Sequence, residues 1–386
     1  MSGLGVNRDY LKKRNRGLAL KLVATKQCTS RIELSKEMGL TKTAISAIVG
    51  ELIDRKYLVE TEKEITKDQG RNPVGLEIAA ASPRYAGVLI QRGYAEAILC
   101  DLSLKSFKYE KVEREWQSEQ ELMSTVTRLL DHMLENEENV AGIGVSSIGP
   151  VDVKAGIIKN PGYFNGIKNV EITAPLRERF SLPVYFDHDN QSAAMAEQLF
   201  GNGHGYQDIL LVGIGRGVGC GIILGGKRCH SKFGYPPEIG HMSINNCGNT
   251  CICGNVGCLE TYIASNVIEE KVRLATGKQM NYRDFCQREE EPEIRKIMEE
   301  MVWNLSSAIV SLVNILNFQI VLLGMDSVYW PERYVRMLEE IINERKFIRN
   351  EGTRTLVRKV AFLERTPVLG AACNALNKTF DGDLLN

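Results

Sequence analysis

The sequence predicts an α/β body that follows a small head made of helices and a β-hairpin. From Tyr85 onward, short apolar strands alternate with helical segments, which is the pattern of an α/β fold. Two short helices with clear start signals lie before residue 60, and an alternating segment follows them. A length of 386 residues gives room for two or three such units.

Composition is that of an ordinary globular protein and excludes several other classes. Apolar residues make up 44% of the chain and charged residues 25%. The most apolar segment, residues 306–324, is interrupted by Asn314, Asn317 and Gln319, so we expect a buried helix that runs into a strand. The basic first twenty residues lack the apolar run of a signal peptide. We therefore expect a cytoplasmic protein with no membrane partner.

Two short helices with capping signals form the first half of the head. Ser30 with Glu33 three residues later makes a capping box, and Gly39 suits the end of that helix. Thr41 caps the second helix, which we expect over residues 42–57. Its apolar residues make one stripe: Ile45, Ile48, Val49, Leu52 and Ile53. Helix, glycine-containing turn and helix together predict a helix-turn-helix.

The polar face of the second helix and the segment after it suit contact with DNA. Lys42, Thr43 and Ser46 are short or basic groups that can reach phosphates and base edges in a major groove. The segment after the helix predicts a β-hairpin wing, in which Arg71 either enters a minor groove or belongs to a plain linker. Residues 1–73 hold 15 Lys and Arg against 9 Asp and Glu, and the remainder holds 33 against 39. This asymmetry favours DNA over a helical protein-interaction module.

One strand of the body ends in a run of polar residues. Residues 85–90 and 95–102 look like paired strands, and "LPVYFDHDN" is a further strand that brings Asp187, His188 and Asp189 to its C-terminal end. Ligands of open α/β sheets lie beyond the carboxyl ends of the strands. The sequence therefore predicts a binding site at this point.

Three cysteines and a histidine have the spacing of a metal site. Cys251, Cys253 and Cys258 fall within eight residues, and nine residues separate His241 from Cys251. Three sulfurs and one imidazole make a closed tetrahedral shell suited to structural Zn²⁺. Cys247 is an alternative fourth ligand, and free or redox-active thiols are an alternative to a metal. The six other cysteines are scattered, as expected of free thiols in a reducing cytosol.

The segment around these ligands resembles the signature of the ROK family, whose name joins repressors, open reading frames and sugar kinases. "EIGHMSINN" and "CICGNVGCLE" carry the resemblance, and "GIGVSSIGPVD", "DHDNQSAAMAEQLFG" and "PVLGAACNAL" extend it along the body. The head, which ends in "GRNP", is similar to the repressor branch, which includes bacterial xylose and N-acetylglucosamine repressors. The resemblance implies an actin-like (RNase H-like) body of two α/β lobes with a sugar cleft between them.

The resemblance also implies a division of the chain and an assembly. Residues 1–80 would form the winged helix-turn-helix domain and its linker. Residues 81–190, completed by 367–386, would form the first lobe, and residues 191–366 the second lobe with the zinc site and a dimerisation surface. We expect a homodimer or a homotetramer.

Residues of the cleft take their expected roles from the resemblance. Asp189 matches an Asp that takes the proton from a sugar hydroxyl in the kinases of the family, and His188 stands where they have Asn. Glu238, His241 and Glu260 match sugar-binding residues. His241 would then serve both the zinc and the sugar, and the metal would fix the loop that aims these side chains into the cleft. Carboxylates and imidazole suit hydrogen bonds to vicinal hydroxyls.

The nucleotide side departs from the pattern of the kinases. Side chains that are bulky or charged replace an Asp, a Thr and several glycines of three nucleotide-binding turns: Leu89, Gln91, Arg92, Arg216, Met325 and Asp326. Such side chains block the close backbone approach that phosphates require. Arg92 and Arg216 either attract an anion or, as we favour, fill a vacated pocket.

Three functional hypotheses follow. We favour a sugar-responsive transcriptional regulator without catalysis, a repressor that binds operator DNA and a sugar or sugar phosphate effector in the bacterial cytoplasm, associated with the nucleoid. The alternative is an ATP-dependent sugar kinase with a regulatory DNA-binding head, which the presence of Asp189 supports. The third is a zinc or redox sensor that ignores sugars.

Overall fold

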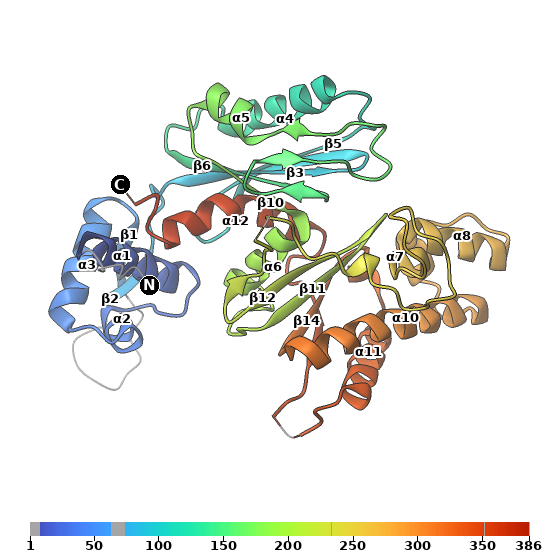
Figure 1. Ribbon diagram of the computed structural model, residues 1–386. Coiled ribbons are helices and arrows are strands. Elements are labelled where there is room, and N and C mark those ends of the chain that lie inside the picture. The colour runs from blue at the N-terminus through green and yellow to red at the C-terminus, as the bar shows by residue number, and fades with distance from the viewer. Residues whose placement is uncertain (1–7, 63–73, 233, 351, 386) are drawn as a thin grey trace.

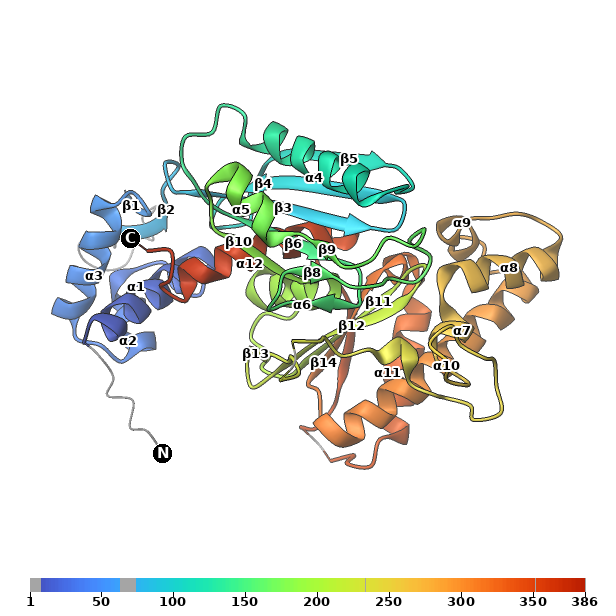
Figure 2. The ribbon, with the colours of Figure 1, turned by 45° about the horizontal axis from the view of Figure 1, so that its top comes forward.

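The computed structural model describes residues 8–62, 74–232, 234–350 and 352–385 (Figure 1). A small head lies beside two α/β lobes, each built on a five-stranded sheet (Figures 1 and 2). This agrees with the predicted α/β body behind a helical head. Among the described helices, none is both long enough and apolar enough to cross a membrane.

The head has three helices and a two-stranded antiparallel hairpin: α1 (Arg8–Ala24), α2 (Arg31–Met38), α3 (Lys42–Asp54), β1 (Leu58–Glu62) and β2 (Val74–Ile78). The predicted caps are confirmed, because Ser30 and Thr41 each accept a hydrogen bond from the backbone amide three residues later, and Gly39 ends α2 with a φ of 62°. The capping box closes differently from expectation. The Glu33 carboxylate accepts from the backbone amide of Thr29 at 2.5 Å, one residue before the cap.

Helix α1, which the sequence analysis did not predict, joins the head to the last helix of the chain, α12 (Thr366–Phe380). Gly17 of α1 lies so close to α12 that a Cβ there would be 2.2 Å from the carbonyl oxygen of Phe380. Leu20 of α1, Leu52 of α3 and Leu376 of α12 belong to one buried apolar cluster. The head and α12 therefore share a core.

The first lobe has its strands in the order β10-β6-β3-β4-β5. These strands are β3 (Arg84–Gln91), β4 (Tyr94–Cys100), β5 (Ser106–Glu113), β6 (Val140–Ser147) and β10 (Val184–His188). Alternate residues of β3 face opposite ways, so Val88 packs with helix α4 (Glu119–Leu134) and Leu89 packs with α12 on the other face. A small sheet and one more helix complete the lobe: β7 (Val151–Asp152), β8 (Ile157–Ile158), β9 (Val170–Glu171) and α5 (Thr173–Phe180).

The second lobe has its strands in the order β13-β12-β11-β14-β15. Its strands are β11 (Ile209–Ile214), β12 (Val218–Leu224), β13 (Lys227–Arg228), β14 (Ile320–Met325) and β15 (Leu356–Lys359). Its helical segments are η1 (Ile239–His241), α7 (Glu260–Ile263), α8 (Ser265–Thr276), α9 (Tyr282–Cys286), α10 (Pro292–Leu316), η2 (Asp326–Tyr329), α11 (Glu332–Arg345) and η3 (Leu363–Arg365). The apolar segment 306–324 is indeed a helix, α10, that runs into a strand, β14.

Two helices lie between the sheets of the lobes (Figures 1 and 2). Helix α6 (Asp189–Phe200) packs against β11 and β12, and α12 packs against β3 and β6. The two helices also pack on one another, and a Cβ on Gly370 would lie 2.5 Å from the backbone of Ser192. The lobes are thus joined by a close helix pair, whose N-terminal ends, at Asp189 and Pro367, both line the same cleft.

Candidate metal centre and ligand cleft

A cleft of about 570 Å³ separates the two lobes. Its lining comes from the β3–β4 turn and the start of α6, and from the β11–β12 turn, η1 and α7 of the second lobe. All five residues predicted to bind a sugar line this cleft: His188, Asp189, Glu238, His241 and Glu260. We call these five residues the sugar side of the cleft.

Asp189 is held in one orientation where β10 ends and α6 begins. It is 3% exposed, and its Oδ1 accepts hydrogen bonds from the Asn190 backbone amide at 2.5 Å and from the Asn190 side chain at 2.8 Å. The side-chain amide of Gln91 donates to its other oxygen. The first turn of α6 favours a negative charge at this place. Sequence reasoning had treated Gln91 only as a replaced glycine and had not identified Asn190 at all.

Glu238 and His188 face one another near Gly149. A Cβ on Gly149 would lie 3.0 Å from the His188 ring and 3.1 Å from Glu238 Oε1, so both side chains meet at this point. Burial of the Glu238 carboxyl in the cleft raises its pKa, and this effect outweighs the lowering influence of His188 and His241. The protonated form of this carboxyl, which can donate as well as accept a hydrogen bond, is therefore easier to reach than for a carboxyl in water.

Glu260 is fixed at the start of α7. Its Oε2 accepts a hydrogen bond from the backbone amide of Val218 at 2.9 Å. The guanidinium of Arg92 lies beside it, since a Cβ on Gly217 would be 3.0 Å from Glu260 Oε2 and 3.1 Å from Arg92 Nη1. Arg92 also donates to the carbonyl oxygen of Gly162 at 2.7 Å. Arg92 therefore lies inside the cleft between an acceptor, the Gly162 carbonyl oxygen, and the Glu260 carboxylate.

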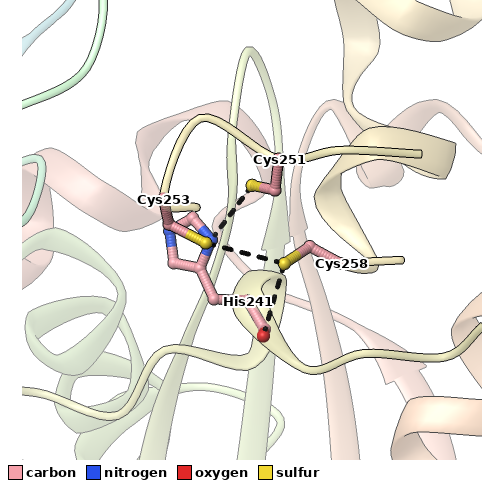
Figure 3. Close-up of side chains that lie close together, drawn as sticks. All are labelled: His241, Cys251, Cys253 and Cys258. Carbon is pink, nitrogen blue, oxygen red and sulfur yellow. Dashed lines mark hydrogen bonds between the residues drawn. The ribbon is translucent and has the colours of Figure 1, made fainter. Parts of the chain in front are cut away.

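The four predicted metal ligands gather at one point (Figure 3). One donor atom from each of His241, Cys251, Cys253 and Cys258 lies within 4.8 Å of every other. His241 Nδ1 is 3.6 Å from Cys251 Sγ, and Cys253 Sγ is 3.7 Å from Cys258 Sγ. Among the residues that the structure describes, Cys247 is exposed and does not belong to this group. The cluster could hold a metal ion, and His241 connects it to the cleft.

The backbone of the cysteine segment turns at two glycines. Gly254 and Gly257 have φ angles of 90° and 73°, which residues with a side chain rarely adopt. A Cβ on Gly257 would also lie 1.7 Å from the carbonyl oxygen of Asn245. Burial raises the pKa of the Cys258 thiol to about 12, so a nearby cation is needed for this sulfur to be a thiolate at neutral pH.

Asp187 has a different role from the one its position in the sequence indicated. It is 1% exposed, does not line the cleft, and accepts a hydrogen bond from His230 Nε2 at 2.9 Å. It also forms an ion pair with Arg228 at 2.5 Å. Burial alone would raise the pKa of Asp187, but His230 and Arg228 outweigh it and leave the pKa below its ordinary value. Both partners follow β12, so this pair ties the first lobe to the second.

The positions that match nucleotide-binding turns in the kinases carry acidic neighbours. We call this group the nucleotide side of the cleft, and it consists of Glu96, Glu113, Glu115, Asp326 and Glu364. Leu89 is fully buried in the sheet and offers no polar group. Arg216 pairs with Glu115 at 3.4 Å. Burial raises the pKa of Asp326, against the lowering effect of its hydrogen bond from Ser265.

The predicted DNA-contacting residues of the second helix share one surface. Lys42, Thr43 and Ser46 are exposed in the first turns of α3, while Ile45 and Val49 on the opposite face are fully buried. A recognition helix has this arrangement, because one of its faces packs against the rest of the domain and the opposite face is exposed for contact with DNA. Arg71, the remaining predicted DNA contact, lies outside the described residues.

The class of protein is defined by a head of three helices and a β-hairpin on a two-lobed α/β body, with a Cys/His cluster at its cleft that could hold a metal ion. The sequence pattern of the ROK family matches residues 85–378, so the chain belongs to the ROK family. It is 26% identical to the xylose repressor of Caldicellulosiruptor bescii over 367 residues, covering 89% of this chain and 90% of the repressor. It is 30% identical to the DNA-binding transcriptional repressor Mlc of Escherichia coli K12 over 277 residues, covering 71% of this chain and 68% of Mlc.

A solved structure extends the likeness to the whole chain. The crystal structure of a ROK family transcriptional regulator, described as a homologue of the E. coli Mlc protein, superimposes with a TM-score of 0.82. The two chains are 25% identical, and the match covers 98% of each. The arrangement of head and lobes is therefore shared with a regulator over nearly its full length.

Proposed function

We propose that the chain is a sugar-responsive transcriptional repressor of carbohydrate-utilisation genes, and that it is not an enzyme. The observation that carries this proposal is the joining of two sites. An exposed polar helix in the head, α3, and a cleft lined by carboxylates and imidazoles are connected through α12, which lines the cleft at Pro367 and packs against α1, the helix on which α3 packs. The repressors to which the chain is similar support the same assignment.

Helix α12 provides the physical connection between the cleft and the head. Pro367 at its N-terminal end lines the cleft, and Phe380 at its other end lies against Gly17 of the head. A sugar that binds one arrangement of the lobes more tightly than another shifts the population toward that arrangement. In a homodimer, the shift would change the distance between two recognition helices and hence the fit to two operator half-sites.

Zn²⁺ is the metal that we propose for the cysteine cluster. Bond lengths of about 2.3 Å to sulfur and about 2.0 Å to nitrogen in a tetrahedron give edges of about 3.8 Å between two sulfurs and about 3.6 Å between sulfur and nitrogen. The corresponding separations are 3.7 Å for Cys253 and Cys258 and 3.6 Å for His241 and Cys251. The donor set and spacing both fit zinc, which would hold His241 at the edge of the cleft.

A kinase function has one supporting residue and several opposing ones. Asp189 is well placed to accept a proton from a sugar hydroxyl, as in the kinases that the sequence resembles. The turns that would hold ATP instead carry Gln91, Arg92, Arg216 and Asp326. Asp326, the carboxylate among these four, repels the nucleotide, and the larger side chains block the close backbone approach that phosphates require. We therefore propose that Asp189 binds a sugar hydroxyl without phosphate transfer.

The proposal is tested by in vitro selection of a DNA duplex that the protein binds. A duplex selected from a randomised pool is labelled, and its affinity is measured by fluorescence anisotropy with and without each member of a sugar panel. We expect tight, salt-dependent binding and at least one sugar that changes the affinity about fivefold or more. Lys42→Ala should weaken binding to every duplex, whereas Lys168→Ala, exposed on the first lobe, should not. A protein that selects no duplex would refute the assignment.

A further inference from the structure

Two polar atoms at the cleft are buried without a hydrogen-bond partner among the described residues, Asn190 Oδ1 and Glu96 Oε2, whereas His188 Nδ1 lies 3.3 Å from Asp189 Oδ1. Their residues, Asn190 and Glu96, are 4% and 7% exposed. The orientation of the Asn190 amide is fixed, because its nitrogen donates to Asp189, and its oxygen is therefore an acceptor. Buried acceptors are rarely left unpaired in proteins, so these atoms indicate a ligand that supplies donors.

The Lys and Arg side chains that line the cleft already have acceptors. Lys111 lies 2.8 Å from Glu113, and Arg216 lies 3.4 Å from Glu115. The remaining one, Arg92, donates to the Gly162 carbonyl oxygen and lies beside Glu260. Each of these three cations therefore already has an acceptor within the protein.

Placing additional negative charge at the nucleotide side of the cleft is energetically unfavourable. Burial raises the pKa of Glu96 to about 7 in spite of nearby Lys111, which shows how strongly this part of the cleft disfavours a carboxylate. Asp326 is half-buried on the opposite wall of the cleft, with a pKa that burial also raises. The other three carboxylates of this side are exposed and contribute a weaker, salt-screened repulsion.

We infer that the effector is a sugar that carries no phosphate, and that its hydroxyl or ammonium groups donate to Asn190 and Glu96. This inference rests on the proposed function and decides which of the two expected effector classes, sugar or sugar phosphate, the cleft accepts. A phosphate monoester carries a charge of about −1.5 to −2 at neutral pH, and its oxygens are acceptors. It would bring further acceptors to the unpaired oxygen of Asn190 and negative charge to Glu96 and Asp326.

Calorimetric titration with matched pairs of ligands tests the inference. The probes are D-glucose and glucose 6-phosphate, D-xylose and xylose 5-phosphate, and N-acetyl-D-glucosamine and its 6-phosphate, each titrated into the full-length zinc-loaded protein. We expect at least one unphosphorylated sugar to bind, and to bind at least tenfold more tightly than its phosphate. The double variant Glu96→Gln with Asp326→Asn should narrow that ratio several-fold by improving the binding of the phosphate.

The matched control is Glu178→Gln, an exposed glutamate on α5, which should leave the ratio unchanged. A phosphorylated sugar that binds as tightly as its partner, or more tightly, overturns the inference and leaves the proposed function intact. A ratio that does not move in the double variant overturns the role of the two carboxylates. Duplex binding that persists with no response to any of the six ligands counts against the inference and against sugar control together.

Discussion

The two sides of the cleft differ in how their polar groups are satisfied. On the sugar side, Asp189 and Glu260 are held by backbone amides, and His241 belongs to the metal cluster. On the nucleotide side, Glu96 is buried with an oxygen that has no partner among the described residues, and Asp326 accepts from a serine hydroxyl. This contrast supports our proposal that one side receives a ligand with hydroxyl groups and that the other disfavours a nucleotide.

This difference shows that the fold and its sites change independently. Strands β11 and β14 pair in parallel with continuous register up to Ile214 and Met325, although Arg216 and Asp326 follow closely. Arg216 and Asp326 line the cleft and so do not interrupt the pairing of the sheet. This arrangement is compatible with our proposal that sugar binding is retained on one side while phosphate transfer is lost on the other.

The largest expected effect comes from removing one of the four candidate metal ligands next to the sugar side. Cys253→Ser should lower zinc affinity more than about 100-fold, since changes that only touch the neighbours of metal ligands already cost about 10–100-fold. The loop that carries His241 should then no longer be held in place by the metal. The change in duplex affinity on adding sugar should therefore disappear. Metal content by mass spectrometry and sugar-dependent duplex binding give the two readouts.

The control for this variant is Cys247→Ser, because Cys247 is exposed and lies outside the cluster. The Cys247→Ser variant should keep both the bound metal and the change in duplex affinity on adding sugar. A Cys253→Ser protein without metal that still responds to sugar would show that the metal does not organise the cleft.

A second prediction concerns the pH dependence of stability and comes from the nucleotide side. The pKa of Glu96 is raised to about 7 in the folded protein, so the folded state binds this proton more tightly than the unfolded state does. The stability contributed by this proton is present below about pH 4.5 and is lost as pH rises through about 7. Glu96→Gln should therefore stabilise the protein by up to about 3 kcal/mol at pH 8 and little at pH 4.5.

Urea unfolding of this variant and of Glu178→Gln at the two pH values provides the measurement. If both variants show the same dependence on pH, the nucleotide side is not strained by buried negative charge, and the contrast between the two sides loses its main support.

A third prediction returns to the sugar side, where Asp189→Asn should weaken sugar binding. The substitution keeps the shape of the side chain but removes a charged acceptor, which costs about 2 kcal/mol, or about thirtyfold in affinity. Asp131→Asn, on the surface of α4, is the matched control. Unchanged sugar affinity in the Asp189 variant, measured by calorimetry, would remove this residue from the binding site.

The smallest expected effect concerns single contacts to DNA phosphates. Lys42→Ala, or Arg71→Ala in the segment outside the described residues, should lower the slope of log affinity against log salt by about one unit. The anisotropy assay at several salt concentrations gives this slope. A slope equal to that of the Lys168→Ala control would exclude the substituted residue from contact with phosphate.

Local signals made much of the fold predictable from the sequence. Ser30, Gly39 and Thr41 act on their own helices, so their caps could be read without knowledge of the rest of the molecule. Helix α1 escaped prediction because what fixes it is distant, namely the approach of Gly17 to Phe380 at the other end of the chain. The wing strands β1 and β2 were predicted from alternation, and their pairing agrees with it.

The part of the candidate site whose residues lie in one short segment could be predicted from the sequence. The contacts between residues from distant segments could not. Three cysteines within eight residues are typical of a metal site, and the structure brings them together with His241. The contacts of Gln91 with Asp189 and of Asp187 with His230 join residues far apart in the chain, and no local pattern marks them. The lack of a hydrogen-bond partner for the Asn190 and Glu96 oxygens, within the described part of the chain, can be recognised only from the structure, because it depends on how deeply these side chains are buried.

The central claim is that sugar binding in this cleft controls DNA affinity without phosphate transfer. It is tested most directly by titrating a sugar into the protein bound to its selected duplex, with and without Mg-ATP, while assaying for phosphorylated sugar. The account predicts the same change in DNA affinity in both conditions and no phosphorylated product. Sustained product formation that Asp189→Asn abolishes, or a DNA affinity that no sugar alters, would contradict it.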